Sequence, residues 1–338
     1  MSIITVIGSG VMGSAMSFPA RTNGHTTRLA GTHLDREIIE HLRATNRHLN
    51  LNRTLPDGVE YYQLEELESA IEGADLIMGG VSSYGVEWFA NEIIPRLPEN
   101  VPVLSITKGM LNLPDGTLIS YPKYYSDKYA GRDFCAVCGP CTSYELADLD
   151  NTTVCFCGNN MDSLLMMRKL FETPYYHIGL TTDIEGLECA VSIKNAYALC
   201  VSLAIGISLK DSDVIHYNSQ AALFGQSVLE MRKILSLYGY GVEDNIVYGV
   251  GDLYVTVFGG RTRKIGTLLG QGYTFKEAKQ KLTGTTLESE VITVRIGEAV
   301  KTLIAAEKTH EGDFPLLLHI YDVIKNNTKI DIPWKSFG

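Results

Sequence analysis

The sequence predicts an α/β domain with a doubly wound parallel sheet at residues 1–185, followed by an all-helical domain at residues 186–338. Three observations lead to this fold class. Short β-rich runs alternate with helix-like segments in the first half, which is the pattern of a parallel sheet. A glycine-rich turn directly follows the first of these runs. After about residue 185, long segments with apolar residues at helical spacing and few turn signals replace the short runs.

The elements of the first half are expected in alternating order. Strands are predicted at Ser2–Ile7, Thr26–Ala30, Ala74–Val81, Val101–Thr107 and Cys135–Val137. Helices are predicted at Ser14–Arg21, Asp35–Ala44, Glu65–Ala70 and Val86–Leu97. The tyrosine-rich stretch Tyr121–Tyr129 is interpreted as a surface loop. In the second half, helices are expected at Gly186–Gly206, Ser219–Tyr238, Phe275–Lys281 and Glu288–Glu307. A cleft between two such halves is where a ligand is expected to bind.

Composition excludes several classes of protein. Acidic side chains outnumber basic ones by 39 to 29, and the resulting charge of −10 argues against binding to nucleic acid or to an anionic membrane. The longest uncharged apolar stretch, Asn195–Leu209, is shorter than the roughly 20 residues that cross a bilayer, so no membrane insertion is expected. Seven cysteines, an odd number, disfavour a secreted disulfide framework. The histidines form no pair at metal-ligand spacing, so no metal site is predicted. A cytoplasmic protein is expected.

The glycine-rich turn is the strongest local signal. Gly8-Ser9-Gly10-Val11-Met12-Gly13 follows a strand and precedes a helix, as in the Rossmann-type dinucleotide-binding motif. The first glycine permits the tight turn, the second lets the backbone approach a pyrophosphate, and the third allows close packing of helix on strand. The alternative is an ordinary glycine-rich turn between a strand and a helix.

The end of the second predicted strand bears on the choice between NAD and NADP. An acidic residue at that position would bind the ribose hydroxyls of NAD. This chain instead has Leu29-Ala30-Gly31-Thr32-His33, and Asp35 arrives late enough to be interpreted as a helix N-cap. Small residues there, with Arg36 nearby, would accommodate a 2′-phosphate. The sequence therefore favours NADP.

Further motifs follow in a fixed order along the chain. They are Ile106-Thr107-Lys108-Gly109, Gly139-Pro140-Cys141-Thr142-Ser143, Ser192-Ile193-Lys194-Asn195-Ala196 after Glu188, Gly251-Asp252-Leu253 with Thr256, and Gly260-Arg261-Thr262-Arg263. In that order and spacing, from the first strand to roughly residue 300, the chain resembles the NAD(P)-dependent glycerol-3-phosphate dehydrogenases.

The resemblance implies an active site between a Rossmann domain and a helical substrate domain, and it implies residue roles. Lys194 would be the catalytic acid or base, with Lys108 and Asp252 in the same catalytic network. Substrate would contact Lys108, Asn195, Thr256, Gly260, Arg261 and Thr262. The cofactor NAD(P) would contact the turn Gly8, Ser9, Gly10, Val11, Met12 and Gly13, and also Lys108, Gly139, Ser143, Arg261 and Glu288.

The implied reaction interconverts dihydroxyacetone phosphate and sn-glycerol 3-phosphate, and the family supplies glycerol 3-phosphate for phospholipid synthesis. Reducing a ketone by hydride leaves negative charge on oxygen, and a positioned ammonium stabilises that charge and delivers the proton. Arginine has the planar, bidentate geometry suited to a phosphate that does not react. The implied partner is therefore a small phosphorylated substrate; a homodimer is left open.

Some positions depart from the family pattern. The usual Ser-Arg-Asn is Gly260-Arg261-Thr262, which loses an amide at the expected phosphate contact. The usual Gly-Pro-Ser is Gly139-Pro140-Cys141. Such changes leave open a dehydrogenase of another small hydroxy acid or phosphorylated ketone on the same fold.

Other interpretations of these residues remain open. Lys194 could be a surface lysine that extends its ammonium to solvent, Asp252 could cap a helix beginning at Leu253, and Lys108 and Arg261 could lie in solvated loops. The spacing Cys138-Gly139-Pro140-Cys141 resembles that of thiol-exchange proteins. Small buried residues around a Gly-Pro turn are the simpler explanation. A non-catalytic nucleotide-sensing protein is a further alternative.

Overall fold

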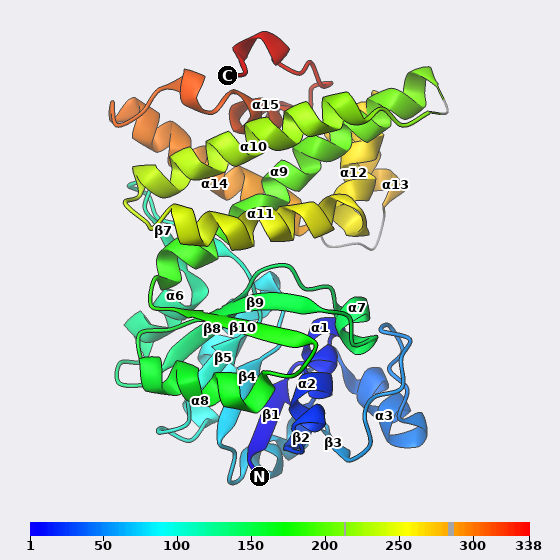
Figure 1. The fold of residues 1–338 in the computed structure, drawn as a ribbon, viewed down its shortest axis with the longest axis vertical. Helices are drawn as coiled ribbons and strands as arrows, with labels where there is room; N and C mark the ends of the chain where they lie inside the picture. The colour runs from blue at the N-terminus through cyan, green and yellow to red at the C-terminus, as the bar shows by residue number, and fades with distance from the viewer. Residues whose placement is uncertain (213, 283–286) are drawn as a thin grey trace. The chain divides into compact units, whose positions relative to one another are not determined.

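The computed structural model describes residues 1–212, 214–282 and 287–338. Contacts divide the chain into two compact units. The sheet unit comprises Met1–Lys108 and Tyr121–Ile184, and the helical unit comprises Gly109–Ser120 and Glu185–Gly338. Figure 1 labels most of the elements.

The sheet unit is built on an eight-stranded sheet in the order β10-β9-β8-β5-β4-β1-β2-β3. The strands are β1 (Ile3–Ile7), β2 (Thr26–Ala30), β3 (Val59–Tyr62), β4 (Leu76–Gly79), β5 (Val103–Ser105), β8 (Phe134–Cys138), β9 (Thr152–Cys157) and β10 (Tyr176–Thr181). Every neighbouring pair is parallel except β8 with β9. The predicted fold class is confirmed, with one antiparallel pair in a sheet that was expected to be wholly parallel.

Short helices connect these strands. They are α1 (Val11–Ala15), α2 (Ser17–Thr22), α3 (Arg36–Thr45), α4 (Leu67–Ile71), α5 (Val86–Trp88), α6 (Tyr121–Lys128), α7 (Ser143–Ala147) and α8 (Met161–Phe171). One-turn 3₁₀ segments lie at Leu64–Glu66, Ser83–Gly85 and Ile94–Arg96, and a π-helical turn spans Phe89–Ile93. Helix α2 packs against both α1 and α8 (Figure 1). The apolar face of the sheet and these helices share one core, which includes Ile4, Leu29, Leu104 and Phe156.

The prediction of a surface loop at Tyr121–Tyr129 is wrong. Residues Tyr121–Lys128 form helix α6, and Tyr121 and Tyr125 are buried. The Tyr125 ring lies 5.8 Å from that of Phe89 and 5.5 Å from that of Phe134, measured between centroids. Buried tyrosines four residues apart on one helical face explain why a stretch that looks polar in sequence packs as a helix.

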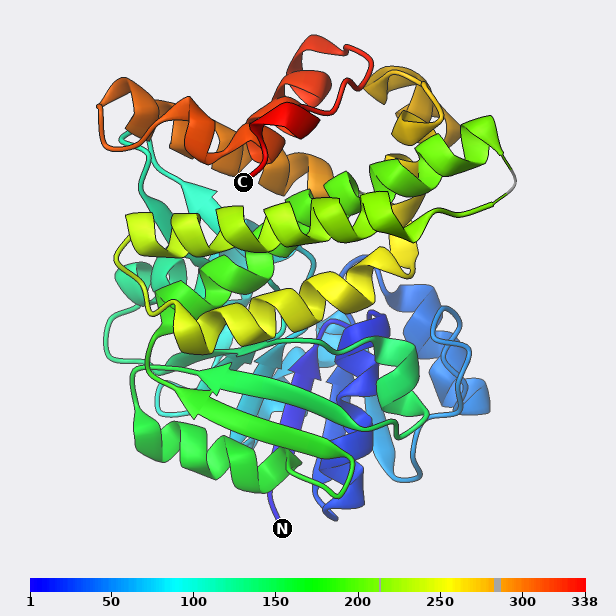
Figure 2. The same cartoon turned by 45° about the horizontal axis from the view of Figure 1, so that its top comes forward.

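The helical unit contains helices that are mostly longer than those of the sheet unit. They are α9 (Ile184–Asp211), α10 (Tyr217–Leu237), α11 (Glu243–Val257), α12 (Gly260–Gly270), α13 (Phe275–Lys281), α14 (Glu288–Ala305) and α15 (Pro315–Asn326). One-turn 3₁₀ segments at Glu311–Asp313 and Trp334–Ser336 lie on either side of α15. Residues from α9, α10, α11, α14 and α15 form a single apolar core, and Figure 2 shows α9 running among its neighbours.

Helix α9 is apolar on nearly every side. By length and composition the stretch Ile184–Lys210 could cross a membrane, but 89% of its most apolar window is buried inside the folded chain. Its contact with α12 is unusually close, since a Cβ on Gly206 would lie 2.0 Å from the carbonyl oxygen of Thr267. The helix is therefore the central core helix of its unit.

A β-hairpin belongs to the helical unit although the residues on both sides of it belong to the sheet unit. It consists of β6 (Met110–Asn112) and β7 (Leu118–Ser120). The hydroxyls of Tyr238 and Tyr240, whose rings stack, donate to the carbonyls of Gly116 at 2.7 Å and Leu118 at 3.3 Å. The sequence predicts a continuous first domain at 1–185 that includes these residues, whereas their contacts lie with the helices.

Candidate functional site

The glycine turn lies at the carboxyl end of β1, as its position after the first predicted strand implies. Gly8 has φ of +112°, which side chains rarely allow, and a Cβ there would lie 2.5 Å from the carbonyl oxygen of Gly80. A Cβ on Gly13 would lie 2.3 Å from the carbonyl oxygen of Gly8. Two of the three glycines are therefore required by the packing of the turn itself.

Gly10 differs from the other two glycines in facing open space. A Cβ built on it meets no atom within 4 Å. Close by in the chain, the Ser9 hydroxyl oxygen is buried without a hydrogen-bond partner in the part of the chain that the structure describes. Space beside a glycine and an unsatisfied hydroxyl in the same turn fit a polar ligand that approaches the backbone, as a dinucleotide pyrophosphate does.

Three other predicted cofactor contacts lie at the same edge of the sheet. Lys108 follows β5, Gly139 follows β8, and Ser143 is the first residue of α7. The Lys108 ammonium donates to the Gly139 carbonyl at 2.8 Å, and α7 packs against α1. Because β1, β5 and β8 run parallel, their carboxyl ends meet at one edge, which is where open α/β sheets bind ligands.

Asp35 is the N-cap residue of α3, as the sequence predicts, but its side chain has another role. Asp35 occupies the position before α3, but its side chain makes no capping hydrogen bond to that helix. Its Oδ2 instead accepts from the backbone N–H of Ser9 at 3.2 Å, and from the N–H and hydroxyl of Thr32, both at 2.8 Å. The carboxylate thus joins the glycine turn to the segment after β2. Ser9 and Thr32, and not the first N–H groups of α3, are the donors to this carboxylate oxygen.

In the helical unit, the structure brings together three predicted site residues. Lys194 lies on α9 and is only 8% exposed. Its Nζ donates to Oδ1 of Asp252 at 2.9 Å and to the hydroxyl of Thr256 at 2.7 Å. That hydroxyl donates in turn to the Asp252 carbonyl oxygen at 2.7 Å. We refer to Lys194, Asp252 and Thr256 as the lysine cluster.

The lysine cluster is positioned by helices α9 and α11. Asp252 and Thr256 are four residues apart on α11, so they share one face of that helix. Asp252 is inside the helix and 2% exposed, which rules out the alternative that it caps a helix starting at Leu253. Lys194 is likewise not a surface lysine. An ammonium taken out of water requires a charged partner, and the Asp252 carboxylate also fixes its direction.

The remaining predicted substrate and cofactor residues of this unit are distributed over three helices. Asn195 is partly buried on α9, and Glu288 is the first residue of α14. Gly260, Arg261 and Thr262 form the first turn of α12, where Gly260 has φ of +79° and Arg261 is exposed. Helix α12 packs against α11, which holds Asp252 and Thr256. Arg261 is therefore on a helix and not in a solvated loop.

The cysteine motif lies at the end of a strand in the sheet. Cys138 ends β8 and is buried, and Cys141 is partly buried. Burial raises the pKa of the Cys135 thiol, three residues before Cys138, far above its ordinary value. Cys138 lies opposite Cys155 across the antiparallel strand pair, inside the sheet. Small buried residues in a sheet explain the motif.

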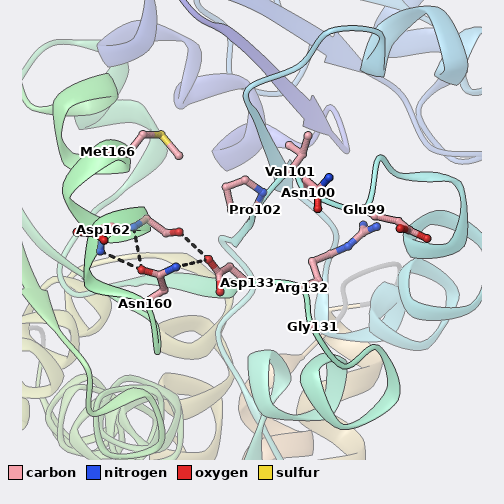
Figure 3. A pocket seen from close by; sticks show the side chains of 11 residues that line it. Glu99, Asn100, Val101, Pro102, Gly131, Arg132, Asp133, Asn160, Asp162 and Met166 are labelled. Carbon is pink, nitrogen blue, oxygen red and sulfur yellow. Dashed lines mark hydrogen bonds between the residues drawn. The ribbon is translucent and has the colours of Figure 1, made fainter.

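A polar cavity of about 450 Å³ lies elsewhere on the sheet unit (Figure 3). It is lined by residues that precede β5 and β8, among them Pro102 and Asp133. Asp133 accepts from the Asn160 amide at 2.8 Å and the Ser163 hydroxyl at 2.6 Å. Since the glycine turn lies beyond the carboxyl end of β1, this cavity is at the opposite edge of the sheet. None of the predicted site residues lines it.

Comparison with known proteins identifies the family. Residues 3–164 match the profile of the NAD-dependent glycerol-3-phosphate dehydrogenase N-terminus, and residues 183–334 match that of its C-terminus. The chain is 32% identical over 337 residues to the NADP(+)-dependent glycerol-3-phosphate dehydrogenase of Archaeoglobus fulgidus, with 97% of each chain covered. It is 27% identical over 329 residues to the glycerol-3-phosphate dehydrogenase [NAD(P)+] of Agathobacter rectalis, which covers 96% of this chain and 92% of that relative.

Solved structures support the same fold. The crystal structure of glycerol-3-phosphate dehydrogenase from Coxiella burnetii matches with a TM-score of 0.81 at 21% identity, covering 99% of this chain and 97% of that one. A D-mandelate dehydrogenase matches with a TM-score of 0.58 at 13% identity, covering 96% and 98%. The fold alone therefore does not select a substrate. The family profiles and the alignments over nearly the whole chain identify the family. On this evidence the chain belongs to the NAD-dependent glycerol-3-phosphate dehydrogenase family.

Proposed function

We propose that this protein is an NAD(P)-dependent glycerol-3-phosphate dehydrogenase that interconverts dihydroxyacetone phosphate and sn-glycerol 3-phosphate. The observation that supports this most directly is the lysine cluster. A buried ammonium held by a carboxylate and a hydroxyl is an arrangement with a cost in stability, and a catalytic role accounts for its presence. The glycine turn, with its open space beside Gly10, supplies the dinucleotide site.

In this proposal the nicotinamide, when bound, exchanges a hydride with carbon 2 of the substrate. Lys194 Nζ holds the proton that the ketone oxygen takes up during reduction and removes it during oxidation. Asp252 keeps the ammonium oriented and balances its charge. Thr256 and Asn195 contact the substrate, and Lys108 contributes a second positive charge next to substrate and cofactor.

Phosphate recognition is assigned to the start of α12. Arg261 presents a guanidinium, which binds phosphate oxygens in pairs, and Gly260 and Thr262 lie on either side of it. Glu288 contacts the cofactor. Binding energy from the unreactive phosphate positions the carbonyl for the reaction. The product would be available for phospholipid synthesis in the cytoplasm.

For the cofactor we propose a preference for NADP. Asp35 is held by Ser9 and Thr32, and the residues that follow β2, Gly31 and Thr32, carry no charge. The named NADP(+) dependence of the Archaeoglobus fulgidus relative supports the same choice.

A single assay tests the activity. Purified protein is mixed with dihydroxyacetone phosphate and either NADPH or NADH, and the loss of nicotinamide absorbance is followed. Turnover with a lower KM for NADPH is expected. Absence of turnover with both cofactors would overturn the proposal. Turnover with an unphosphorylated 2-oxo acid at equal kcat/KM, in place of dihydroxyacetone phosphate, would move the substrate to another class.

A further inference from the structure

The peptide groups flanking Ser9 are held from outside the glycine turn on both sides. The Ser9 N–H donates to Asp35 Oδ2 at 3.2 Å, and the Ser9 carbonyl lies 2.7 Å from Nε2 of His48. Asp35 and His48 are 26 and 39 residues further along the chain, and neither belongs to the glycine motif. Tertiary structure has thus placed a carboxylate and an imidazole on the two sides of one turn residue.

The hydrogen bonds of His48 determine its tautomer. Its Nδ1 accepts from the backbone N–H groups of Asn50 at 3.1 Å and Leu51 at 3.0 Å. A nitrogen that accepts two N–H groups has no proton of its own, so the proton lies on Nε2 and is donated to the Ser9 carbonyl. The ring is fully buried, and both of its nitrogens form hydrogen bonds with backbone groups. A phenyl or aliphatic side chain in this place would fill the space without fixing the turn.

Asp35 also joins the turn to the segment after β2. The same oxygen that accepts from Ser9 accepts from the N–H and hydroxyl of Thr32. In a doubly wound sheet, the segments after β1 and β2 are those that lie along a dinucleotide. One carboxylate therefore ties together two segments that the cofactor would touch.

We propose that Asp35 and His48 are positioning residues for cofactor binding, which hold the Ser9 backbone so that the turn keeps open the space beside Gly10. This inference rests on the proposed dinucleotide site. Glycine-rich backbone has more freedom to lose on ordering than any other, so a turn fixed before the cofactor arrives binds it more tightly. Neither residue touches the reacting atoms in this proposal. Their effect is on affinity for the cofactor and not on the hydride step.

The test measures cofactor binding directly, without substrate, by the change in NADPH or NADH fluorescence on titration. Asp35→Ala and His48→Ala each remove one hydrogen bond to the Ser9 backbone, and each is therefore expected to raise the dissociation constant for both cofactors about fivefold to tenfold. At saturating cofactor, kcat is expected to stay within about twofold of wild type, because the variants remove no group from the lysine cluster.

Conservative variants separate positioning from loss of folding. Asp35→Asn keeps an oxygen acceptor for Ser9 and Thr32, and His48→Gln keeps an N–H donor. Both are expected to recover most of the affinity. Because both side chains act through the same residue, the double variant D35A/H48A is expected to raise the dissociation constant by less than the product of the two single effects.

Arg53→Ala is the matched control. Arg53 lies in the same loop as His48 and makes a two-point ion pair with Asp148 at 2.6 and 2.8 Å, but it does not touch the turn. Its removal should leave cofactor affinity within about twofold of wild type, as for an exposed pair.

The outcomes are distinguishable. Folded D35A and H48A proteins that bind both cofactors with wild-type affinity would overturn the inference. So would an equal loss of affinity in R53A, which would indicate general loosening of the loop. A wild-type protein that binds neither cofactor would instead overturn the proposed function.

Discussion

The glycine turn of the sheet unit and the lysine cluster of the helical unit are built from different parts of the chain. The turn consists of consecutive residues, Gly8 to Gly13, whose backbone forms its shape. The cluster joins Lys194 to residues 58 and 62 positions away, and its geometry lies in side chains. The turn should therefore be sensitive to an added Cβ, and the cluster to a changed functional group. Substitutions that add a Cβ to the turn, and others that change a functional group of the cluster, test this difference separately.

The largest effect is expected from Lys194→Met. Removing the proposed acid and base should lower kcat by about a thousandfold or more, in the upper part of the range for general acid–base catalysis. Affinity for NADPH, which depends on the turn, should change by less than about twofold. Steady-state turnover and fluorescence titration measure the two quantities. Lys210→Met, on the exposed end of the same helix, is the control and should retain turnover.

The free energy of unfolding provides a second measurement on Lys194 and its partner Asp252. Lys194→Met leaves the Asp252 carboxylate buried without its ammonium, which should lower the free energy of unfolding by about 3 kcal/mol. The double variant K194M/D252N removes both charges and should recover most of that loss, while turnover stays absent. Denaturant unfolding of both variants checks this. Retained turnover in either would contradict the role assigned to Lys194.

Two alanine substitutions in the turn should have opposite consequences. Gly13→Ala places a Cβ 2.3 Å from the Gly8 carbonyl oxygen and should cost about 2–3 kcal/mol of unfolding free energy through overpacking. Gly10→Ala meets no protein atom, so stability should be unchanged. Its methyl group enters the proposed pyrophosphate space and should raise the NADPH dissociation constant about tenfold, about 1.4 kcal/mol.

Thermal unfolding and cofactor titration of the two turn variants decide between these outcomes. If Gly10→Ala were destabilised while cofactor affinity was kept, the space beside Gly10 would not be the cofactor site.

A smaller effect is expected at Thr256. Thr256→Val keeps the β-branched shape but loses the hydroxyl that accepts from Lys194 at 2.7 Å. The loss of about one hydrogen bond should lower kcat about fivefold to tenfold and leave affinity for NADPH unchanged. Thr293→Val, which removes a buried helix hydroxyl that donates to the backbone carbonyl of Ser289, serves as the comparison and should leave kcat unchanged. Equal kcat values for both variants would contradict a contribution of the Thr256 hydroxyl to turnover.

The smallest effect concerns pH and the turn. Burial lowers the pKa of His48 below its ordinary value of 6.5, against the opposing effects of the Ser9 carbonyl and the Asp35 charge, while His41 lowers it further. The folded protein thus holds His48 neutral where the unfolded chain takes up a proton. His48 therefore costs no stability above about pH 6.5. Below that pH the free energy of unfolding falls, by at most about 1.4 kcal/mol per pH unit, because the unfolded chain binds the proton and the folded one does not.

Unfolding free energies of wild type and His48→Gln at pH 7.5 and 5.5 test this contribution. Burial lowers the pKa of His25 and His319 in the same direction, so both proteins should lose stability in acid. The decline should be smaller in the variant. Equal declines would show that His48 does not contribute.

Much of the sheet unit was predictable because its signals are local. The β-branched runs at Ile3–Ile7 and Thr26–Ala30 form strands close to the expected bounds, and the glycine turn follows the first of them. Strands β9 and β10 were missed, since Thr152–Cys157 and Tyr176–Thr181 mix polar and apolar residues without a marked turn between helix and strand. The helices α11, α12 and α15 were also missed.

The candidate site was predictable in composition but not in contacts. The motifs around Lys194, Asp252 and Thr256 were found by their order along the chain, and the structure brings their side chains together. Asp35 was assigned to helix capping and His48 was not singled out. No local pattern distinguishes a carboxylate that caps its own helix from one that binds a turn 26 residues away.

The sequence by itself determined the fold class, the glycine turn and the family, because these depend on short-range periodicity, on glycine positions and on motifs that are contiguous in the chain. Only the tertiary structure decided which unit the hairpin Met110–Ser120 joins, that Tyr121–Lys128 is a helix, and which side chains hold Ser9. The physical reason is the same in each case. Hydrogen bonds and apolar contacts between distant residues compete with local preference, and their partners exist only once the chain has folded.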